Sequence, residues 1–269
     1  MAHDTPLDSV RELVEFWQAT DPTSPRLTWY GPDSERVELS GRVLANWVIK
    51  ATNLLTEEAD AGPRVVVGVD LPVHWRAMVW SLAALRAGAS VDLAVADTAG
   101  GLPRSMGAPP VVDAVVTAHP ERARERVRAG GSVIAVALPA LARSFDGPLG
   151  PGVIDGAADL MTYPDVLTQP TESDPDGPAI DGASHADLLA WARRTTAGAA
   201  GPGAVRPPSE APTGSTATGP RALVASSDPR VALATSLAAW AERGSVVVVG
   251  DARSAADLAH LAQVEGTAS

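Results

Sequence analysis

Carboxylates at the ends of predicted strands are the first residues of this chain that could do chemistry. Asp70 and Asp97 directly follow the apolar stretches 64–69 and 89–96, and Asp92 lies within the second stretch, where its strand could end. Ligands bind at that edge of open α/β sheets, so these side chains could hold a metal ion or a ribose hydroxyl. The commoner alternative is that they only cap helices or accept hydrogen bonds from loop N–H groups.

A second feature is a run of small and hydroxyl residues that ends in a basic one. Backbone N–H groups in such a run can approach an anion closely. The alternative is an ordinary loop, which this composition usually forms, and we favour it. The segment is nevertheless the best place on the chain for anion binding, through Thr213, Gly214, Ser215, Thr216, Thr218, Gly219 and Arg221.

Other catalytic patterns are missing, and we predict no catalytic residue and no metal site. The chain has no cysteine, and its five histidines lack metal-ligand spacing. Ser226 and Ser227 precede Asp228, but no G-x-S-x-G motif surrounds them. His74 and Trp75 could stack on a ligand ring, although burial in the core is the better interpretation.

Composition restricts the function classes. The net charge of −11 and pI of about 4.8 argue against partners such as nucleic acid or an anionic membrane. The 45% hydrophobic content predicts a folded core, and no apolar run is long enough for a membrane span, so we expect a cytoplasmic protein. Lys50 is the single lysine, which together with the abundant Ala, Gly, Val and Arg is typical of a GC-rich bacterium.

Apolar periodicity predicts alternating strands and helices, and therefore an α/β fold in which parallel sheets lie between helices in three layers. Ser9 or Asp8 should cap the first helix, and Gly88 should end the helix that contains Trp75 and Leu85. Strands are predicted at 26–30, 36–39, 64–69, 89–96, 111–117, 132–138 and 222–225, and helices at 7–19, 40–55, 120–129, 184–197 and 254–264, with loops at 144–156, 168–182 and 198–220.

Two segments repeat one pattern. Residues 81–88 and 236–244 are alike, and each is preceded by a strand and a proline-containing turn and followed by a strand. We therefore predict one domain, 1–269, built of pseudo-related halves at about 1–165 and 184–269 that are joined by the acidic loop 168–183. The alternative is chance similarity between Ala/Leu-rich helices.

The order of these units resembles the N-terminal domain of the adenylate-forming superfamily, which includes acyl-CoA synthetases. The resemblance rests on the hairpin around Leu27-Thr-Trp-Tyr30, the P-x-x-W turn, the segment LAALRAGA and the helix start Ser184-His185. More particularly, the chain resembles a short, truncated actinobacterial relative of that superfamily. The resemblance implies ATP or AMP as cofactor.

The superfamily's phosphate-binding loop has a gap-free counterpart here. Anchored on Ser184-His185, Thr171 matches the loop's first Thr, Pro178 its Pro, and Ala179 its Lys. The positions that would approach a phosphate are Thr171, Ser173 and Gly177. However, Glu172, Asp174 and Asp176 replace small neutral residues, and carboxylates repel a triphosphate unless a metal ion bridges them.

Other parts of the family's apparatus have no counterpart in this sequence, including the motifs for adenine and ribose and the catalytic lysine. We therefore expect a degenerate, non-catalytic domain that binds a small ligand or a protein, and nucleotide binding is doubtful. The alternative is an acyl-adenylate or acyl-CoA ligase subunit completed by a separate C-terminal domain. Trp17, Trp29 and Trp47 could form a protein interface, although core burial is preferred.

Overall fold

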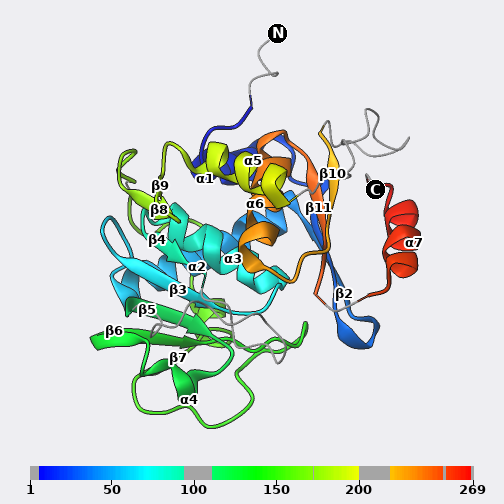
Figure 1. The fold of residues 1–269 in the computed structure, drawn as a ribbon. Coiled ribbons are helices and arrows are strands. Elements are labelled where there is room, and N and C mark those ends of the chain that lie inside the picture. The colour runs from blue at the N-terminus through cyan, green and yellow to red at the C-terminus, as the bar shows by residue number, and fades with distance from the viewer. Residues whose placement is uncertain (1–5, 94–110, 172, 200–218, 251–252, 268–269) are drawn as a thin grey trace. The chain divides into compact units, whose positions relative to one another are not determined.

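The computed structural model describes residues 6–93, 111–171, 173–199, 219–250 and 253–267 (Figure 1). The chain divides into two compact units. Unit 1 comprises residues 1–45, 73–75 and 186–269, and unit 2 comprises residues 46–72 and 76–185. Unit 1 thus combines segments from both ends of the sequence, whereas unit 2 comes from its middle.

Unit 1 contains a four-stranded sheet in the order β10-β11-β1-β2. β1 (Pro25–Tyr30) runs parallel to β11 (Ser245–Val249) and antiparallel to β2 (Arg36–Ser40), which confirms the predicted hairpin. β10 (Arg221–Val224) runs parallel to β11. Every residue of β11 is buried, as the continuous apolar run of a parallel strand predicts.

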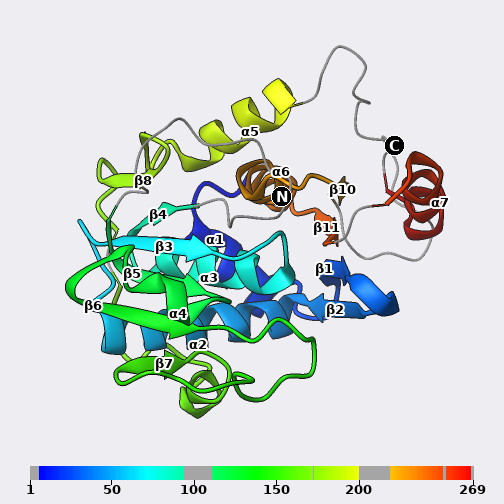
Figure 2. The ribbon, with the colours of Figure 1, turned by 60° about the horizontal axis from the view of Figure 1, so that its bottom comes forward.

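The first helix of unit 1 begins at its predicted cap, but the predicted helix start Ser184-His185 is wrong, because Ser184 belongs to a short strand and the helix begins only at Leu188. α1 (Val10–Glu15) starts after Ser9, whose hydroxyl accepts the N–H of Glu12, and continues into a π-helical turn. α5 (Leu188–Ala199) lies beside α6 (Pro229–Ala241), as Figures 1 and 2 show. α7 (Ala255–Glu265) is capped by Ser254, and its Leu258 and Leu261 pack against β11.

Unit 2 contains a seven-stranded sheet in the order β7-β6-β5-β3-β4-β8-β9. Neighbouring strands are parallel except for the β8–β9 pair. Figure 2 shows β3, β5 and β6 side by side. The strands are β3 (Val66–Asp70), β4 (Ser90–Asp92), β5 (Val112–Thr117), β6 (Val127–Ala135), β7 (Val153–Asp155), β8 (Pro178–Ile180) and β9 (Ala183–Ser184).

Three helices accompany these strands along the sequence, α2 (Gly41–Ala59), α3 (Trp75–Arg86) and α4 (Pro120–Ala123). The helix predicted at 120–129 is wrong beyond Ala123, because Val127 pairs with β5 and packs against its buried valines. β6 therefore begins five residues before the predicted strand 132–138. The predicted loops 144–156 and 168–182 contain the short strands β7 and β8.

Mostly parallel strands flanked by helices confirm the predicted α/β class. Among the described residues, no helix has the length and apolar character needed to span a bilayer. The pseudo-relationship of the halves 1–165 and 184–269 stays a prediction.

Candidate functional site

The segment at the phosphate-loop position ends in a tight β-hairpin formed by β8 and β9 of unit 2. Its turn residues Asp181 and Gly182 have φ of 49° and 81°, the left-handed pair that a type I′ turn requires. β8 also pairs with β4, so the hairpin lies at the edge of the large sheet. Ala179, at the position of the family's lysine, is fully buried and supplies only a methyl group.

Asp174 satisfies the loop that precedes this hairpin. Its carboxylate accepts the N–H of Asp176 at 3.1 Å, and its carbonyl accepts the N–H of Gly177 at 2.9 Å. The carbonyl of Gly177 in turn accepts the N–H of His185 at 3.0 Å. The N–H of Asp176, which could otherwise donate to a phosphate oxygen, therefore donates to an acidic side chain of the same loop. Ser173 is exposed.

Thr171 bonds to a buried cation that the sequence reasoning missed. The guanidinium of Arg86, in the last turn of α3, donates a hydrogen bond to the Thr171 hydroxyl. Arg86 and Thr171 are 9% and 8% exposed. The one signal in the sequence was a basic residue that ends an otherwise apolar helix, and it gave no indication of a partner 85 residues later.

His185 directly follows the hairpin, and it is 9% exposed. Burial lowers the pKa of His185, while a hydrogen bond to the Gly88 backbone and the charge of Asp174 act in the opposite direction. Its Nε2 is buried and has no hydrogen-bond partner. Gly88 can turn there because it adopts φ of 87° at the end of α3. The lowered pKa favours a neutral ring near neutral pH.

The alternative anion loop lies mostly outside the described residues, which include only Gly219 and Arg221 of its candidates. A Cβ on Gly219 would come within 2.0 Å of the Glu242 carbonyl oxygen, so this glycine is needed for close backbone packing. Thr213, Gly214, Ser215, Thr216 and Thr218 are not described. Anion binding by this loop therefore stays a prediction.

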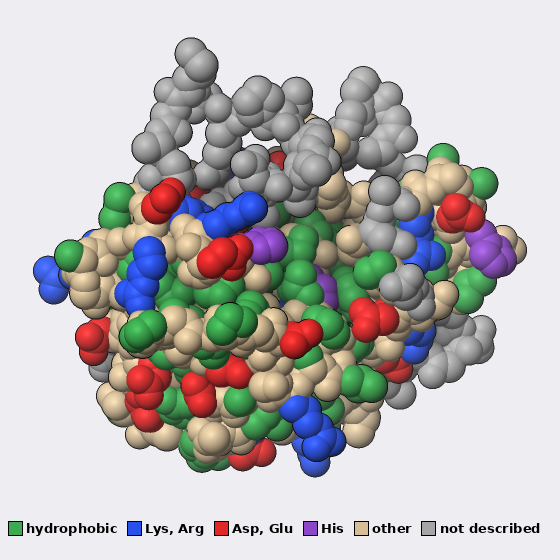
Figure 3. Space-filling model, turned by 90° about the horizontal axis from the view of Figure 1, so that it is seen from below, with side chains coloured by type: hydrophobic (Ala, Val, Ile, Leu, Met, Phe, Trp, Pro, Cys, Tyr) green, Lys and Arg blue, Asp and Glu red, His purple; other side chains and the backbone are tan. Residues whose placement is uncertain are grey.

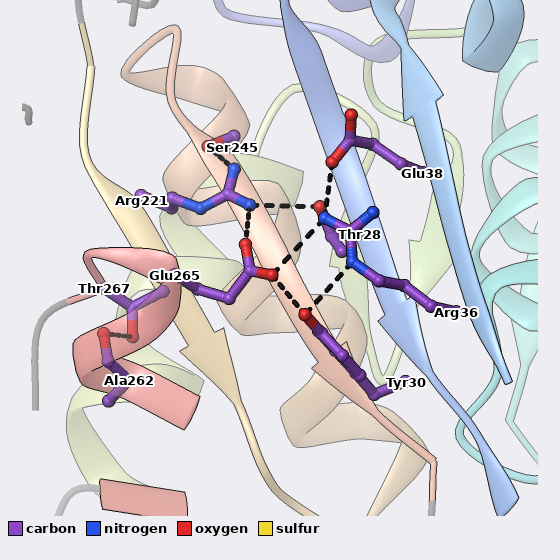
Figure 4. A network of polar contacts seen from close by, with 9 residues as sticks. All are labelled: Thr28, Tyr30, Arg36, Glu38, Arg221, Ser245, Ala262, Glu265 and Thr267. Atoms are coloured by element: carbon purple, nitrogen blue, oxygen red, sulfur yellow. Dashed lines mark hydrogen bonds and ion pairs between the residues drawn. The ribbon is translucent and has the colours of Figure 1, made fainter. Parts of the chain in front are cut away.

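Arg221 belongs to a polar network on the small sheet of unit 1 (Figure 4). Its Nη2 donates to Glu265 at 2.5 Å and to the Thr28 hydroxyl at 3.1 Å. Glu265 also accepts a hydrogen bond from the hydroxyl of Tyr30 and lies 3.4 Å from the guanidinium of Arg36. These hydrogen bonds to Tyr30 and Arg221 lower the pKa of Glu265 against the opposing effect of burial. The network attaches α7 to the sheet.

The acidic strand ends in unit 2 gather around one arginine. Arg126 Nη1 lies 3.6 Å from Asp70, and its Nη2 lies 3.8 Å from Asp92. Thr117, at the end of β5, donates to Asp70 at 3.3 Å. Asp97 lies outside the described residues. Within the described part of the chain, no group of three or more acidic, histidine or cysteine side chains could hold a metal ion.

The remaining sequence candidates have structural roles. Asp228 caps α6 by accepting the N–H of Arg230 at 2.8 Å, and its own N–H binds Ser226 at 3.1 Å. His74 is 4% exposed, so the core interpretation is confirmed. The ammonium of Lys50 donates to the carbonyl of Tyr163, which commits the chain's single lysine to holding a loop.

The tryptophans offered as an interface are not gathered on a surface. Trp17 and Trp29 are 0% and 1% exposed and belong to the core of unit 1. Trp47 is half-buried, with the guanidinium of Arg76 5.4 Å from its ring centre. Trp17 and Trp29 are therefore buried in the core, and of the three tryptophans only Trp47 has a partly exposed side chain that a partner could contact.

Solved structures with this fold include acyl-CoA synthetases and related ligases. An acyl-CoA synthetase from Brucella canis matches with a TM-score of 0.68 at 16% identity, over 98% of this chain and 47% of that chain. Acetoacetyl-CoA synthetase from Streptomyces lividans matches with a TM-score of 0.61 at 15% identity, over 90% of this chain and 38% of that chain. The chain therefore has the fold of the N-terminal domain of adenylate-forming enzymes and spans about half the length, or less, of these structures.

A closer relationship is visible in sequence. A TIGR03089 family protein of Mycobacterium tuberculosis (strain ATCC 25618 / H37Rv) is 34% identical over 188 residues, which are 69% of this chain and 71% of that protein. The chain belongs to the TIGR03089 family. No family model matches the sequence.

Proposed function

We propose that this chain is a degenerate member of the adenylate-forming superfamily that does not adenylate substrates and instead binds a small ligand or a protein. The observation that carries the proposal is the internal bonding of the phosphate-loop counterpart by Asp174. A triphosphate would have to displace this carboxylate from the N–H of Asp176 and then lie beside two exposed acidic side chains. Both requirements disfavour binding of ATP, because its triphosphate is negatively charged.

Two further residues at the phosphate-loop position support the same conclusion. Ala179 supplies no positive charge, and the hydroxyl of Thr171 bonds to Arg86. The net charge of −11 also disfavours nucleic-acid partners, and the face shown in Figure 3 carries acidic as well as basic side chains. We place this function in the cytoplasm, as the composition predicts.

Calorimetric titration with ATP, with and without magnesium, and with AMP tests the proposal. We expect no binding by the unchanged protein at nucleotide concentrations that saturate working adenylate-forming enzymes. Asp174→Ala should free the N–H of Asp176 and remove one charge, so that any residual affinity for ATP increases. Asp146→Asn, which removes an exposed carboxylate elsewhere in unit 2, is the control. Formation of an acyl-adenylate from ATP and any carboxylic acid would refute the proposal.

A second candidate function is a ligase half that acts together with a separate C-terminal domain. It is favoured by the match over 98% of this chain but 47% of the Brucella canis synthetase. Affinity purification of the tagged chain from its native cells should then recover a protein that carries the remaining half, and the mixture should form acyl-adenylate. Recovery of no such protein would count against this candidate.

A further inference from the structure

The large sheet of unit 2 has a topological switch point between β3 and β5. From β3 the chain continues to β4 on one side, and from β5 it continues to β6 on the other. At such a point the two connections leave in opposite directions and open a crevice outside the carboxyl ends of the strands, where ligands of open α/β sheets bind. β3 ends at Asp70 and β5 ends at Thr117, and these two residues are partners across the ladder.

Polar side chains converge on this edge from three strands and one loop. Thr117 is fully buried and donates to Asp70, while Asp92 ends the neighbouring β4. Arg126, just before β6, approaches both carboxylates, but its distances of 3.6 and 3.8 Å exceed those of a hydrogen-bonded ion pair. By contrast, the nearby pair Arg128–Asp113, which joins β6 to β5, is in close contact at 2.5 Å.

Two nitrogens of the Arg126 guanidinium are buried without a hydrogen bond. Arg126 is 9% exposed, and its Nε and Nη2 have no hydrogen-bond partner. Buried guanidinium N–H groups are normally satisfied, so the unsatisfied groups of Arg126 need an explanation, and a polar ligand between Arg126 and the two carboxylates supplies one. The side chains of Asp70 and Asp92 retain 16% and 17% exposure, so the site can be reached from solvent.

The charges of the site select the chemistry of that ligand. Two carboxylates and one guanidinium sum to −1, which disfavours an anion, and the guanidinium disfavours a metal ion. A hydroxyl group satisfies both kinds of residue, because it donates to a carboxylate and accepts from a guanidinium. Two adjacent hydroxyls match two carboxylates that share one arginine.

The β3–α3–β4 unit supports a sugar. In dinucleotide-binding folds, an acidic residue about 20 residues after the first βα turn binds the ribose diol, and a glycine-rich turn holds the pyrophosphate. Asp92 has the corresponding place at the end of β4, but the turn after β3 reads Leu71-Pro-Val-His74 and contains no glycine. We propose that Asp70, Asp92 and Arg126 bind the vicinal diol of an uncharged sugar, either free or as the ribose of a nucleoside.

Titration of the ¹⁵N-labelled full chain with methyl β-D-ribofuranoside and with adenosine tests this site. The amide signals of Asp70, Asp92 and Thr117 should shift with both compounds, and the 2-deoxy counterparts should bind at least about tenfold more weakly, since the site would lose one of its two hydroxyl partners. Response to adenosine alone would identify a nucleoside as the source of the diol, and response to both would identify the sugar. Equal responses to ribosides and deoxyribosides, or no response to any riboside, would overturn the proposal.

Matched variants locate the response. Asp92→Asn, which is nearly isosteric, and Arg126→Met should each abolish the shifts, whereas Arg128→Met should retain them because its partner Asp113 lies outside the cluster. If Arg126→Met does not fold, Asp92→Asn decides, and shifts that survive it would refute the site. This proposal is independent of the phosphate-loop hairpin, because nucleotide bound there would shift the amides of Gly177 and Ala183 instead.

Discussion

The strand–helix–strand segments β3–α3–β4 and β10–α6–β11 have the same backbone plan and carry different chemistry. In each, a turn containing proline leads into the helix, and the second strand runs parallel to the first. The two helices end in the same way. The N–H of Ala89 binds the carbonyl of Ala84 at 3.0 Å, and the N–H of Gly244 binds that of Ala239 at 2.9 Å, both across a residue with positive φ.

The differences lie at the strand ends and in the core. β3 and β4 end in Asp70 and Asp92, whereas β10 and β11 end in valines, so only one of the two segments has carboxylates at its strand ends. Aligned by their pattern, Leu85 of α3 corresponds to Trp240 of α6. Local signals thus specify the shared backbone plan, whereas the side chains at the strand ends and in the helices differ between the two segments.

Replacing Trp240 of α6 by leucine, the residue at the corresponding position of α3, should give the largest loss of stability. Trp240 is fully buried, packs edge-on against Trp17 at 5.3 Å, and donates its indole N–H to the carbonyl of Arg26 at 2.9 Å. Trp240→Leu should lower the free energy of unfolding by about 3 kcal/mol, through the cavity and the orphaned carbonyl. Urea denaturation measures this loss.

Trp240→Phe is the control, because it keeps a ring against Trp17 and loses only the hydrogen bond and part of the volume. Its loss should be less than that of Trp240→Leu. Equal stability of the leucine variant and the unchanged protein would show that α6 tolerates the side chain found in α3. The two segments would then not differ in what their cores require.

Removing the glycine at the end of α3 should have the next largest effect. Gly88 has φ of 87°, and a Cβ there adds strain. Gly88→Ala should lower the free energy of unfolding by about 1–2 kcal/mol, with a matching fall in the urea midpoint. Ala87→Gly, one residue earlier, has no positive φ to relieve and serves as the position control. A stability unchanged by Gly88→Ala would mean that the turn can adopt another conformation.

The parts of the fold that the sequence predicts correctly are those specified by short stretches of neighbouring residues. Gly88, the cap at Ser9 and the β1–β2 hairpin are encoded by neighbouring residues, and the structure confirms them. The predicted start of β6 is too late because residues 127–129 belong to the Arg-rich stretch that predicts a helix at 120–129, and only the pairing of Val127 with β5 makes them a strand.

The site was harder to predict than the fold. The turn sequence Asp174-Pro-Asp-Gly177 is a local signal, and its internal hydrogen bonds follow from it. Arg86 and Arg126 were missed because their partners, Thr171 and Asp70, lie far away in the sequence. Long-range polar pairs leave no periodicity or motif, so their detection required the three-dimensional structure.

Lowering the pH should reduce the stability of the two units at different pH values, because His185 of unit 2 and Glu265 of unit 1 take up protons at different pH. Burial depresses the pKa of His185 below its ordinary 6.5, so protons bind the unfolded hairpin more tightly than the folded one. Stability of unit 2 should therefore fall as the pH drops from 6.5 towards the folded pKa. Glu265 of unit 1 also has a lowered pKa, so the stability it contributes is present above its ordinary 4.5 and is lost only below that pH.

Amide hydrogen exchange between pH 7.5 and 4 resolves the order of these two events, with β8 and β9 losing protection before α7. His185→Gln should remove the first event and leave the second. Loss of protection in α7 before the hairpin, or an unchanged first event in His185→Gln, would refute this assignment.

Converting the end of α6 to that of α3 should give the smallest effect, and in the stabilising direction. Arg243 has φ of 58° at the position where α3 has Gly88. Its carbonyl accepts a hydrogen bond from Arg26, which glycine preserves, while its guanidinium lies 5.4 Å from the ring centre of Phe16 and that contact would be lost. Relief of the left-handed strain should outweigh the half-buried cation–π contact, so Arg243→Gly should raise the free energy of unfolding by about 0.5 kcal/mol. Arg243→Ala, which loses the same contact and keeps a Cβ, should be less stable than Arg243→Gly. Equal stabilities of the glycine and alanine variants would show that the two helix ends, although alike in hydrogen bonding, are not under the same conformational strain.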